Sequence, residues 1–203
     1  FYVDGVMVEN HFDFLNLHAH RSSREIEREL LKRTEEHSDE IGNGDSVVYM
    51  PPSNLHALFL LRHSASHFAA EKIVLRHICD WAMFLKHNAS NIDWEWLYDV
   101  CRTQDMDRFL DALNGYAVDY FNIDSRLLPN FARRNDLEQR ILNDILQPEF
   151  CEPKPEKGLI RIILFKYRRW WANRWKHRLV YREGLLHSFI TQAWSHILKP
   201  KAI

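Results

Sequence analysis

One pattern recurs through the middle of this chain: a residue that can cap a helix, followed by apolar residues at helical spacing. Helices are predicted over residues 53–68, 71–87, 93–103, 105–121 and 135–146, with Asp93 and Asp105 as caps. The chain has only six glycines among 203 residues, too few for the many tight turns of an all-β fold. The sequence therefore predicts a mostly helical protein, in which the first two helices are joined by a short link and pack antiparallel.

Residues 1–14 predict a β-hairpin. Asp4-Gly5 supplies the two positive-φ positions of a type I′ turn, and side chains then alternate between two faces along the second strand. Glu9 and His11 share the polar face of that strand.

Residues 22–37 predict an exposed helix that begins with serine caps, and residues 46–50 predict a short strand. The expected fold class is α+β and mostly α, with a short β-hairpin or sheet remnant, then a helical domain, then a basic two-helix tail.

The proline-rich segment 148–158 is the one convincing linker in the sequence. It separates a basic aromatic tail over 159–203 from a helical domain over 51–147, which itself follows a sheet remnant with one helix over 1–50. Within the tail, helices are predicted over 159–181 and 183–198. The chain starts at Phe1 inside a strand-like pattern, so we expect a further segment upstream of it.

Composition excludes several classes of protein. The formal net charge is −1, which gives no bulk attraction to nucleic acid or anionic lipid. No run of about eighteen apolar residues exists, so the sequence predicts no transmembrane segment, and the first residues lack the order of a signal peptide. The three cysteines have no Cys-x-x-Cys spacing, which is typical of free thiols in a reducing compartment. We therefore expect a cytoplasmic protein.

Positive charge is concentrated near the end of the chain. Between Lys154 and Arg182 there are ten Lys or Arg residues and a single acidic residue, Glu156, interleaved with tyrosines and tryptophans. Such a pattern suits an anionic partner along Arg161–Arg182, either single-stranded nucleic acid or an anionic membrane surface. The alternative is structural: apolar side chains pack on the body while the basic residues stay solvated. The apolar residues concerned are Ile162, Ile163, Phe165, Trp170 and Leu179.

Histidines form a stripe along the helix predicted over 53–68, where His63 and His67 are four residues apart. In the next helix, Arg76 and Asp80 have the spacing of an ion pair. If His63 and His67 on the first helix face Arg76 and Asp80 on the second, these four residues form either a structural hydrogen-bond network or the wall of a substrate cleft. In the second interpretation Arg76 binds an anion and Asp80 orients a histidine, which makes all four candidate substrate-binding residues.

A metal site is a further interpretation of the same residues. His63 and His67 have the spacing of metalloprotease ligands, and Asp80 can be a third ligand, so a metal-dependent hydrolase stays open. Position 64 is Ser, however, where the His-Glu-x-x-His motif places its general base. The signal for that chemistry is therefore weak.

Four segments resemble a known family: VMVENHFDF, PPSNLHALFLLRHSASHF, LRHICDWAMFL and NIDWEWL. They are similar to the carboxy-terminal part of a family of uncharacterised bacterial nucleotidyltransferases within the polymerase-beta-like superfamily. The resemblance runs from residue 1 to about 150 and, more loosely, through KYRRWWANRWKHRL. In that superfamily a Gly-Ser loop and an aspartate pair bind the nucleoside triphosphate and magnesium, and a later strand supplies a third carboxylate.

The resemblance assigns Glu9 to that third carboxylate, with His11 beside it, whereas the loop and the aspartate pair have no counterpart in this sequence. It implies an incomplete catalytic unit of an enzyme that transfers a nucleoside monophosphate from a triphosphate to an unknown acceptor hydroxyl. Glu9 would hold the magnesium ion or deprotonate the acceptor, and the helical domain would shape the acceptor side. Two other classes stay open: a non-catalytic module for nucleic acid or membrane surfaces, and the metal-dependent hydrolase.

Overall fold

The computed structural model describes residues 2–3, 6–7, 13–15, 17, 20–36, 40–43, 46–70 and 73–184. Within these ranges the chain is mostly helical, which confirms the main prediction. None of the helices in the described part is long and apolar enough to cross a membrane. Glu9, His11 and nearly all of the helix predicted over 183–198 lie outside the described residues.

Two short antiparallel strand pairs precede and follow the first helix. Strand β1 (Tyr2–Val3) pairs with β2 (Val6–Met7), and β3 (Glu40–Asn43) pairs with β4 (Ser46–Tyr49). The sequence predicts β4, but β3 was missed because Ile41 is its only large apolar residue. Residues 8–12 of the predicted second strand lie outside the described part.

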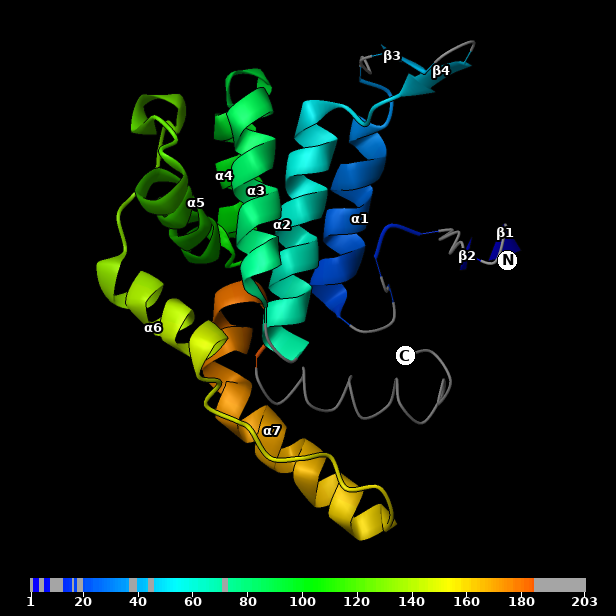
Figure 1. The fold of residues 1–203 in the computed structure, drawn as a ribbon, viewed down its shortest axis with the longest axis vertical. Coiled ribbons are helices and arrows are strands. Elements are labelled where there is room, and N and C mark those ends of the chain that lie inside the picture. The colour runs from blue at the N-terminus through cyan, green and yellow to red at the C-terminus, as the bar shows by residue number, and fades with distance from the viewer. Residues whose placement is uncertain are drawn as a thin grey trace.

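The seven α-helices of the described residues form one packed array (Figure 1). They are α1 (Arg21–Arg33), α2 (Ser53–Ala70), α3 (Leu75–Asn88), α4 (Trp94–Thr103), α5 (Asp107–Phe121), α6 (Asn135–Leu146) and α7 (Leu159–Val180). Single 3₁₀ turns follow α3 (Ala89–Asn91) and α5 (Ser125–Leu127). Helices α1, α2 and α3 run side by side, α5 packs on α3, and α7 crosses obliquely at the lower end of α2.

Capping explains where α4 begins but not where α5 begins. Asp93 caps α4 as predicted, since its carboxylate accepts a hydrogen bond of 3.1 Å from the backbone N–H of Trp96. Asp105 was also predicted as a cap, but α5 begins at Asp107 and Met106 is its N-cap. Asp105 instead has φ 56°, the left-handed conformation that Asp tolerates in a tight turn.

Helix α1 is not the fully exposed helix that its charges predict. Ser22 and Ser23 are buried inside the helix and do not cap it. Both hydroxyls lie near the fully buried guanidinium of Arg62 in α2, at 3.4 and 3.2 Å. The same guanidinium donates to the backbone oxygen of Val180 at 2.9 Å. A buried cation needs hydrogen-bond acceptors, so Arg62 joins α1, α2 and the end of α7.

Helix α7 has two different halves. Its carboxy-terminal half shares the core with α2 and α5, where Leu179 and Val180 are buried. Its amino-terminal half projects from the array, so the prediction that Ile163 packs on the body is wrong: the side chain is 56% exposed. The prediction that every basic residue stays solvated is also wrong, since Lys176 is 1% exposed.

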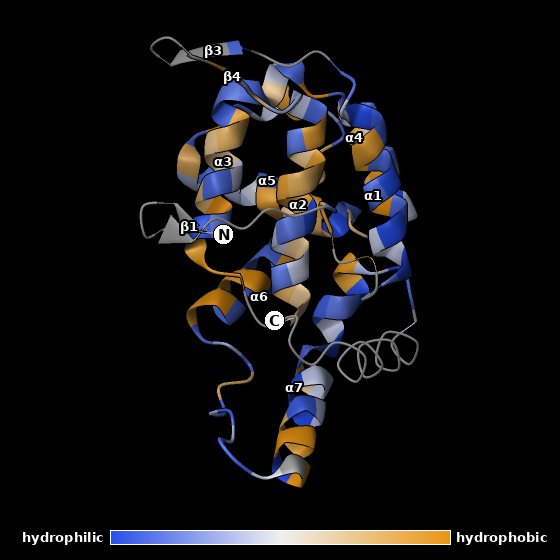
Figure 2. Ribbon diagram, turned by 90° about the vertical axis from the view of Figure 1, so that its right-hand side faces the viewer, coloured by the Kyte–Doolittle hydropathy of each residue, from blue (hydrophilic) through white to orange (hydrophobic). Residues whose placement is uncertain are grey.

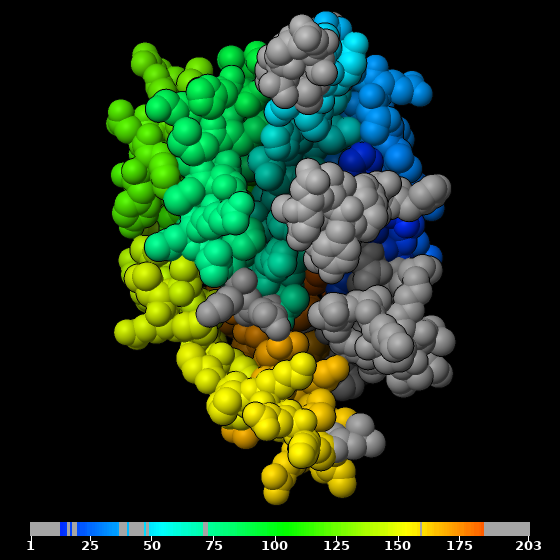
Figure 3. Space-filling view, turned by 45° about the vertical axis from the view of Figure 1, so that its right-hand side comes forward, coloured from blue at the N-terminus to red at the C-terminus, as the bar shows by residue number. Residues whose placement is uncertain are grey.

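The segment between α6 and α7 folds back along the projecting half of α7 (Figure 3). The rings of Phe150 and Phe165 have centroids 5.3 Å apart in an edge-to-face arrangement, and Glu152 forms an ion pair of 2.5 Å with Arg168. The region predicted as a linker is therefore irregular in structure, but it is packed on the helix that follows it.

Candidate functional site

The strongest cluster of chemically active side chains lies where α2 ends and α3 begins. His63 and His67 are one turn apart on the last turns of α2, and His77 is in the first turn of α3. The antiparallel packing of these two helices brings the three histidines together. His63 and His67 are exposed, and His77 is half-buried.

The three imidazoles are in mutual contact. Ring centroids are 4.6 Å apart for His63 and His67, 5.2 Å for His67 and His77, and 6.0 Å for His63 and His77. One ring nitrogen from each histidine lies within 4.8 Å of the other two. Among the described residues, this is the one group of three or more such ligands.

Two of the three histidines, His63 and His77, favour their neutral form. Burial lowers the pKa of His63 below its ordinary value, and the neighbouring His67 and His77 lower it further. Burial is also the main cause that lowers the pKa of His77, followed by His67. Three imidazolium ions this close would repel one another, so the cluster is arranged for uncharged rings with available lone pairs.

His77 also contributes to helix α3 itself. Its Nδ1 accepts a hydrogen bond of 3.2 Å from the backbone N–H of Val74, the N-cap residue of α3. This bond satisfies a donor just before the helix and fixes the ring over the α2 face. Because Nδ1 is the acceptor, the proton of the neutral ring is on Nε2.

Arg76 and Asp80 form the exposed ion pair that their spacing predicts, with Nε and Oδ2 3.6 Å apart. Asp80 raises the pKa of His63 and His77, against the larger effect of burial, so its carboxylate is near both rings. The residue that completes the histidine cluster is nevertheless His77, and not the Asp80 that the sequence analysis placed with His63 and His67. The sequence shows that His77 lies between Arg76 and Asp80 on the same predicted helix. It does not show that this part of α3 lies beside His63 and His67 of α2.

Two hydrogen bonds and a ring contact connect this face of the helices to residues 14 and 15, near the amino terminus. The backbone N–H groups of Phe14 and Leu15 donate to the two carboxylate oxygens of Glu27 in α1, at 2.9 and 3.0 Å. The Phe14 ring packs edge-to-face on Phe59 of α2 at 6.1 Å, and Phe59 stacks on His63 at 5.9 Å. Glu27 could not be identified from the sequence, because its role depends on residues twelve and thirteen positions away.

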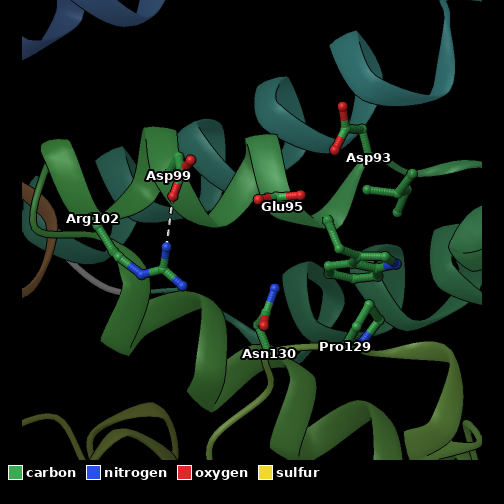
Figure 4. A pocket seen from close by; sticks show the side chains of 8 residues that line it. Asp93, Glu95, Asp99, Arg102, Pro129 and Asn130 are labelled. Carbon is green, nitrogen blue, oxygen red and sulfur yellow. Dashed lines mark hydrogen bonds and ion pairs between the residues drawn. The ribbon is translucent and has the colours of Figure 1, made fainter.

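Two hollows of the described surface lie away from the histidines and are lined by acidic residues. The larger, of about 600 Å³, lies between the start of α4 and the turn at Pro129-Asn130 (Figure 4). Asp93, Glu95 and Asp99 line it, and the carboxylate of Asp99 faces Arg102 at 2.6 Å. Asp93 is already used as a helix cap. A groove with three carboxylates and one paired arginine repels a triphosphate, so we assign no nucleotide to it.

Comparison with known proteins links the amino-terminal part of the chain to one family. The sequence model of a family described as uncharacterised nucleotidyltransferase matches residues 1–122. The match ends at Asn122, the left-handed C-cap residue of α5, and includes the whole histidine cluster. Helices α6 and α7 lie beyond it. No curated protein and no solved structure gives a significant match.

Proposed function

The chain belongs to the uncharacterised nucleotidyltransferase family, and from this premise we propose that it transfers a nucleoside monophosphate from a triphosphate to an acceptor hydroxyl. We further propose that it shares the chemistry of the polymerase-beta-like superfamily, and that this chain carries only part of the catalytic unit. The observation that supports this proposal is the family match, which covers both the Glu9 segment and the helices α2 and α3.

The anchoring of Phe14 is consistent with this assignment. Glu9 is five positions before Phe14 in the sequence, so at about 3.3 Å per residue of extended chain their Cα atoms can be no more than roughly 17 Å apart. The Phe14 ring packs on the Phe59 face of α2. His63 lies on that face beside Phe59. We therefore place the acceptor between the Glu9 strand and the end of the α2–α3 pair, with Arg76 and the histidines as its binding residues.

The chemistry assigned to this chain is limited to its own residues. In this proposal Glu9 holds a metal ion or takes the proton of the acceptor hydroxyl, and His11, two residues further along the sequence, is the second catalytic residue. The Arg76 side chain is 84% exposed, and its ion-pair partner among the described residues is Asp80, so its guanidinium can reach a phosphate oxygen.

In this proposal, Glu9 is the residue of this chain that binds magnesium. Mg²⁺ prefers oxygen ligands and is held by one or two carboxylates plus the substrate phosphates, where it neutralises charge on the triphosphate. Glu9 is outside the described residues. The described histidine cluster offers nitrogen ligands, which prefer transition metals to magnesium. The three cysteines are free, which is consistent with the proposed cytoplasmic location.

Nucleotide binding tests the proposal directly. We expect a magnesium nucleoside triphosphate to bind saturably, in calorimetry, to the chain extended upstream through its reading frame. The Glu9→Gln variant removes one metal-binding charge. It should weaken binding of the magnesium complex by at least about tenfold, because a charge-assisted contact contributes roughly 1.5–3 kcal/mol.

Glu95→Gln is the matched control, because Glu95 is exposed in the acidic groove and distant in sequence from the strand. It should bind like the unmodified protein. Equal binding by Glu9→Gln and Glu95→Gln, or no binding by the extended chain, contradicts the assignment.

A second candidate function concerns the projecting half of α7. Five large apolar side chains on it are between 46% and 74% exposed: Ile160, Ile163, Leu164, Tyr167 and Trp171. Their spacing of three, four and seven residues places them on one face of the helix, the α7 ridge. Figure 2 shows hydrophobic residues at this lower end of α7, mixed with hydrophilic ones.

Basic residues border the α7 ridge. Arg161 and Arg168 are exposed at its side, and the guanidinium of Arg174 lies 4.6 Å from the Trp171 ring. Apolar residues beside cations match an anionic membrane surface, where aliphatic groups enter the acyl boundary and arginines meet the headgroups. Single-stranded nucleic acid stacks on aromatic rings, whereas three of the five ridge residues are aliphatic. We therefore propose an anionic lipid surface as the partner.

Vesicle co-sedimentation tests the α7 ridge. The full chain should bind vesicles that contain phosphatidylserine and should bind pure phosphatidylcholine vesicles at least about tenfold more weakly, because each juxtaposed Lys or Arg adds roughly 1 kcal/mol. Leu164→Glu should abolish binding, since it places a charge in the apolar face. Leu127→Glu, at an exposed leucine of the turn after α5, is the control and should bind normally. Equal binding by both variants, or binding to an oligonucleotide but not to vesicles, overturns the lipid assignment.

A further inference from the structure

We infer that His63, His67 and His77 form a binding site for a transition-metal ion of the zinc class, on the surface where α2 meets α3. The site uses the histidines that the proposed function places beside the acceptor, but metal binding by them does not require nucleotidyl transfer. The inference rests on the geometry of the cluster and the chemistry of its ligands.

The geometry requires only a small closure. Two nitrogens bound to one tetrahedral Zn²⁺ at 2.0–2.1 Å lie about 3.3 Å apart. The three candidate nitrogens are already within 4.8 Å of one another, so the widest gap has to close by roughly 1.5 Å. His63 and His67 are exposed, and rotation about their side-chain bonds supplies a shift of that size.

The backbone beneath the cluster is rigid. Helix α3 is fixed one turn after His77 by Trp81, which is 1% exposed and donates from its indole nitrogen to the side-chain oxygen of Asn114 at 3.0 Å. Leu61 and Phe68 fix α2 on both sides of the two histidines, because both are fully buried. Two histidines one turn apart on one such helix and a third on its neighbour are a preformed set of three ligands.

The chemistry of the side chains also suits a metal. A neutral imidazole offers a ring-nitrogen lone pair to a metal ion, and histidine is the commonest metal ligand in proteins. The nearby carboxylate of Asp80 favours a cation at the same place.

Binding changes the role of His77. If Nε2 is the ligand, its proton moves to Nδ1 and the hydrogen bond from Val74 is given up; if Nδ1 is the ligand, the metal replaces that hydrogen bond. Val74 is exposed, so water can accept from its N–H instead. The loss is small compared with a metal–nitrogen bond.

The ligand set selects the ion and limits the chemistry. Imidazole nitrogens suit Zn²⁺, Ni²⁺ and Cu²⁺, whereas Mg²⁺ takes oxygen ligands. Three protein ligands leave a fourth position open to water or to a substrate oxygen. Ser64 follows His63, where the metalloprotease motif has its glutamate base, so we assign metal binding to these residues and no peptide hydrolysis.

Calorimetric titration of the full chain with ZnCl₂ at neutral pH tests the site. We expect one ion per chain. His77→Ala should weaken binding by at least about 100-fold, since even the outer partners of metal ligands are worth 10–100-fold. His87→Ala is the matched control, because His87 is an exposed histidine on the same helix outside the cluster. It should leave the affinity unchanged.

Two further measurements keep the test decisive. His67→Gln should also lose binding, which covers the case in which His77→Ala disturbs the start of α3. Co²⁺ in place of Zn²⁺ should give a spectrum without a thiolate charge-transfer band. Saturable binding that is unchanged in both histidine variants, a thiolate band from the free cysteines, or no saturable binding at all would each overturn the inference. None of these outcomes depends on nucleotide binding, so the metal site and the transferase proposal can fail separately.

Discussion

Replacing Lys176 with methionine is expected to lower the free energy of unfolding by about 3–5 kcal/mol, the usual result of removing one partner of a buried ion pair. The Nζ of Lys176 lies 2.5 Å from a carboxylate oxygen of Asp144, and both side chains are 1% exposed. Methionine leaves the Asp144 carboxylate buried without its counter-charge. Chemical denaturation at neutral pH measures the loss.

The double variant Lys176→Met/Asp144→Leu is the informative control. It replaces the pair by apolar groups and should recover most of the lost stability, because an apolar pair of similar volume is often as stable as a buried ion pair. If the single and double variants are equally unstable, packing and not charge is the contribution of Lys176. The pair joins α6 to α7, so this result also measures how firmly the carboxy-terminal half of α7 is held.

Stability is expected to fall by about 3 kcal/mol between pH 6.5 and pH 4 through His177 alone. Burial lowers the pKa of His177 to about 4, from an ordinary value of 6.5. Between these two values the unfolded chain binds a proton that the folded chain does not, so the free energy of unfolding decreases as the pH falls. Each pH unit is worth about 1.4 kcal/mol for one such group.

Denaturation of His177→Gln at pH 7 and at pH 4.5 isolates this effect from other titrating groups. The difference in stability between the two pH values should be smaller than in the unmodified protein by about 2–3 kcal/mol. His87→Gln, at an exposed histidine, should retain the full difference. A His177→Gln variant with an unchanged pH dependence would show that His177 is already charged in the folded state at pH 4.5.

Local signals were sufficient for most helices. The cap at Asp93 and the apolar period after it predict α4 well, because a capping side chain acts on backbone groups only three residues away. The same reasoning failed at Asp105, Ser22 and Ser23, where a residue that can cap is used in a tight turn or in a buried contact. Residue type alone cannot distinguish these uses.

Contacts between distant segments could not be predicted from the sequence. Glu27 binds the backbone of Phe14 and Leu15, and Lys176 pairs with Asp144 across two helices. Both residues look like ordinary surface charges in a polar pattern. Their burial depends on how α1, α6 and α7 pack, and packing is not periodic along the chain.

The histidine site shows the same division. By itself, the sequence determined that the chain is mostly helical, that His63 and His67 share one helix face, and that Arg76 can pair with Asp80, because helical periodicity sets which residues three or four apart are neighbours. Only the tertiary structure decided that His77, and not Asp80, completes the cluster. That choice depends on the axial register of α3 against α2, which is set by contacts across the two helices such as His56 with Phe84 and Ser53 with Asn88, between residues far apart in the chain.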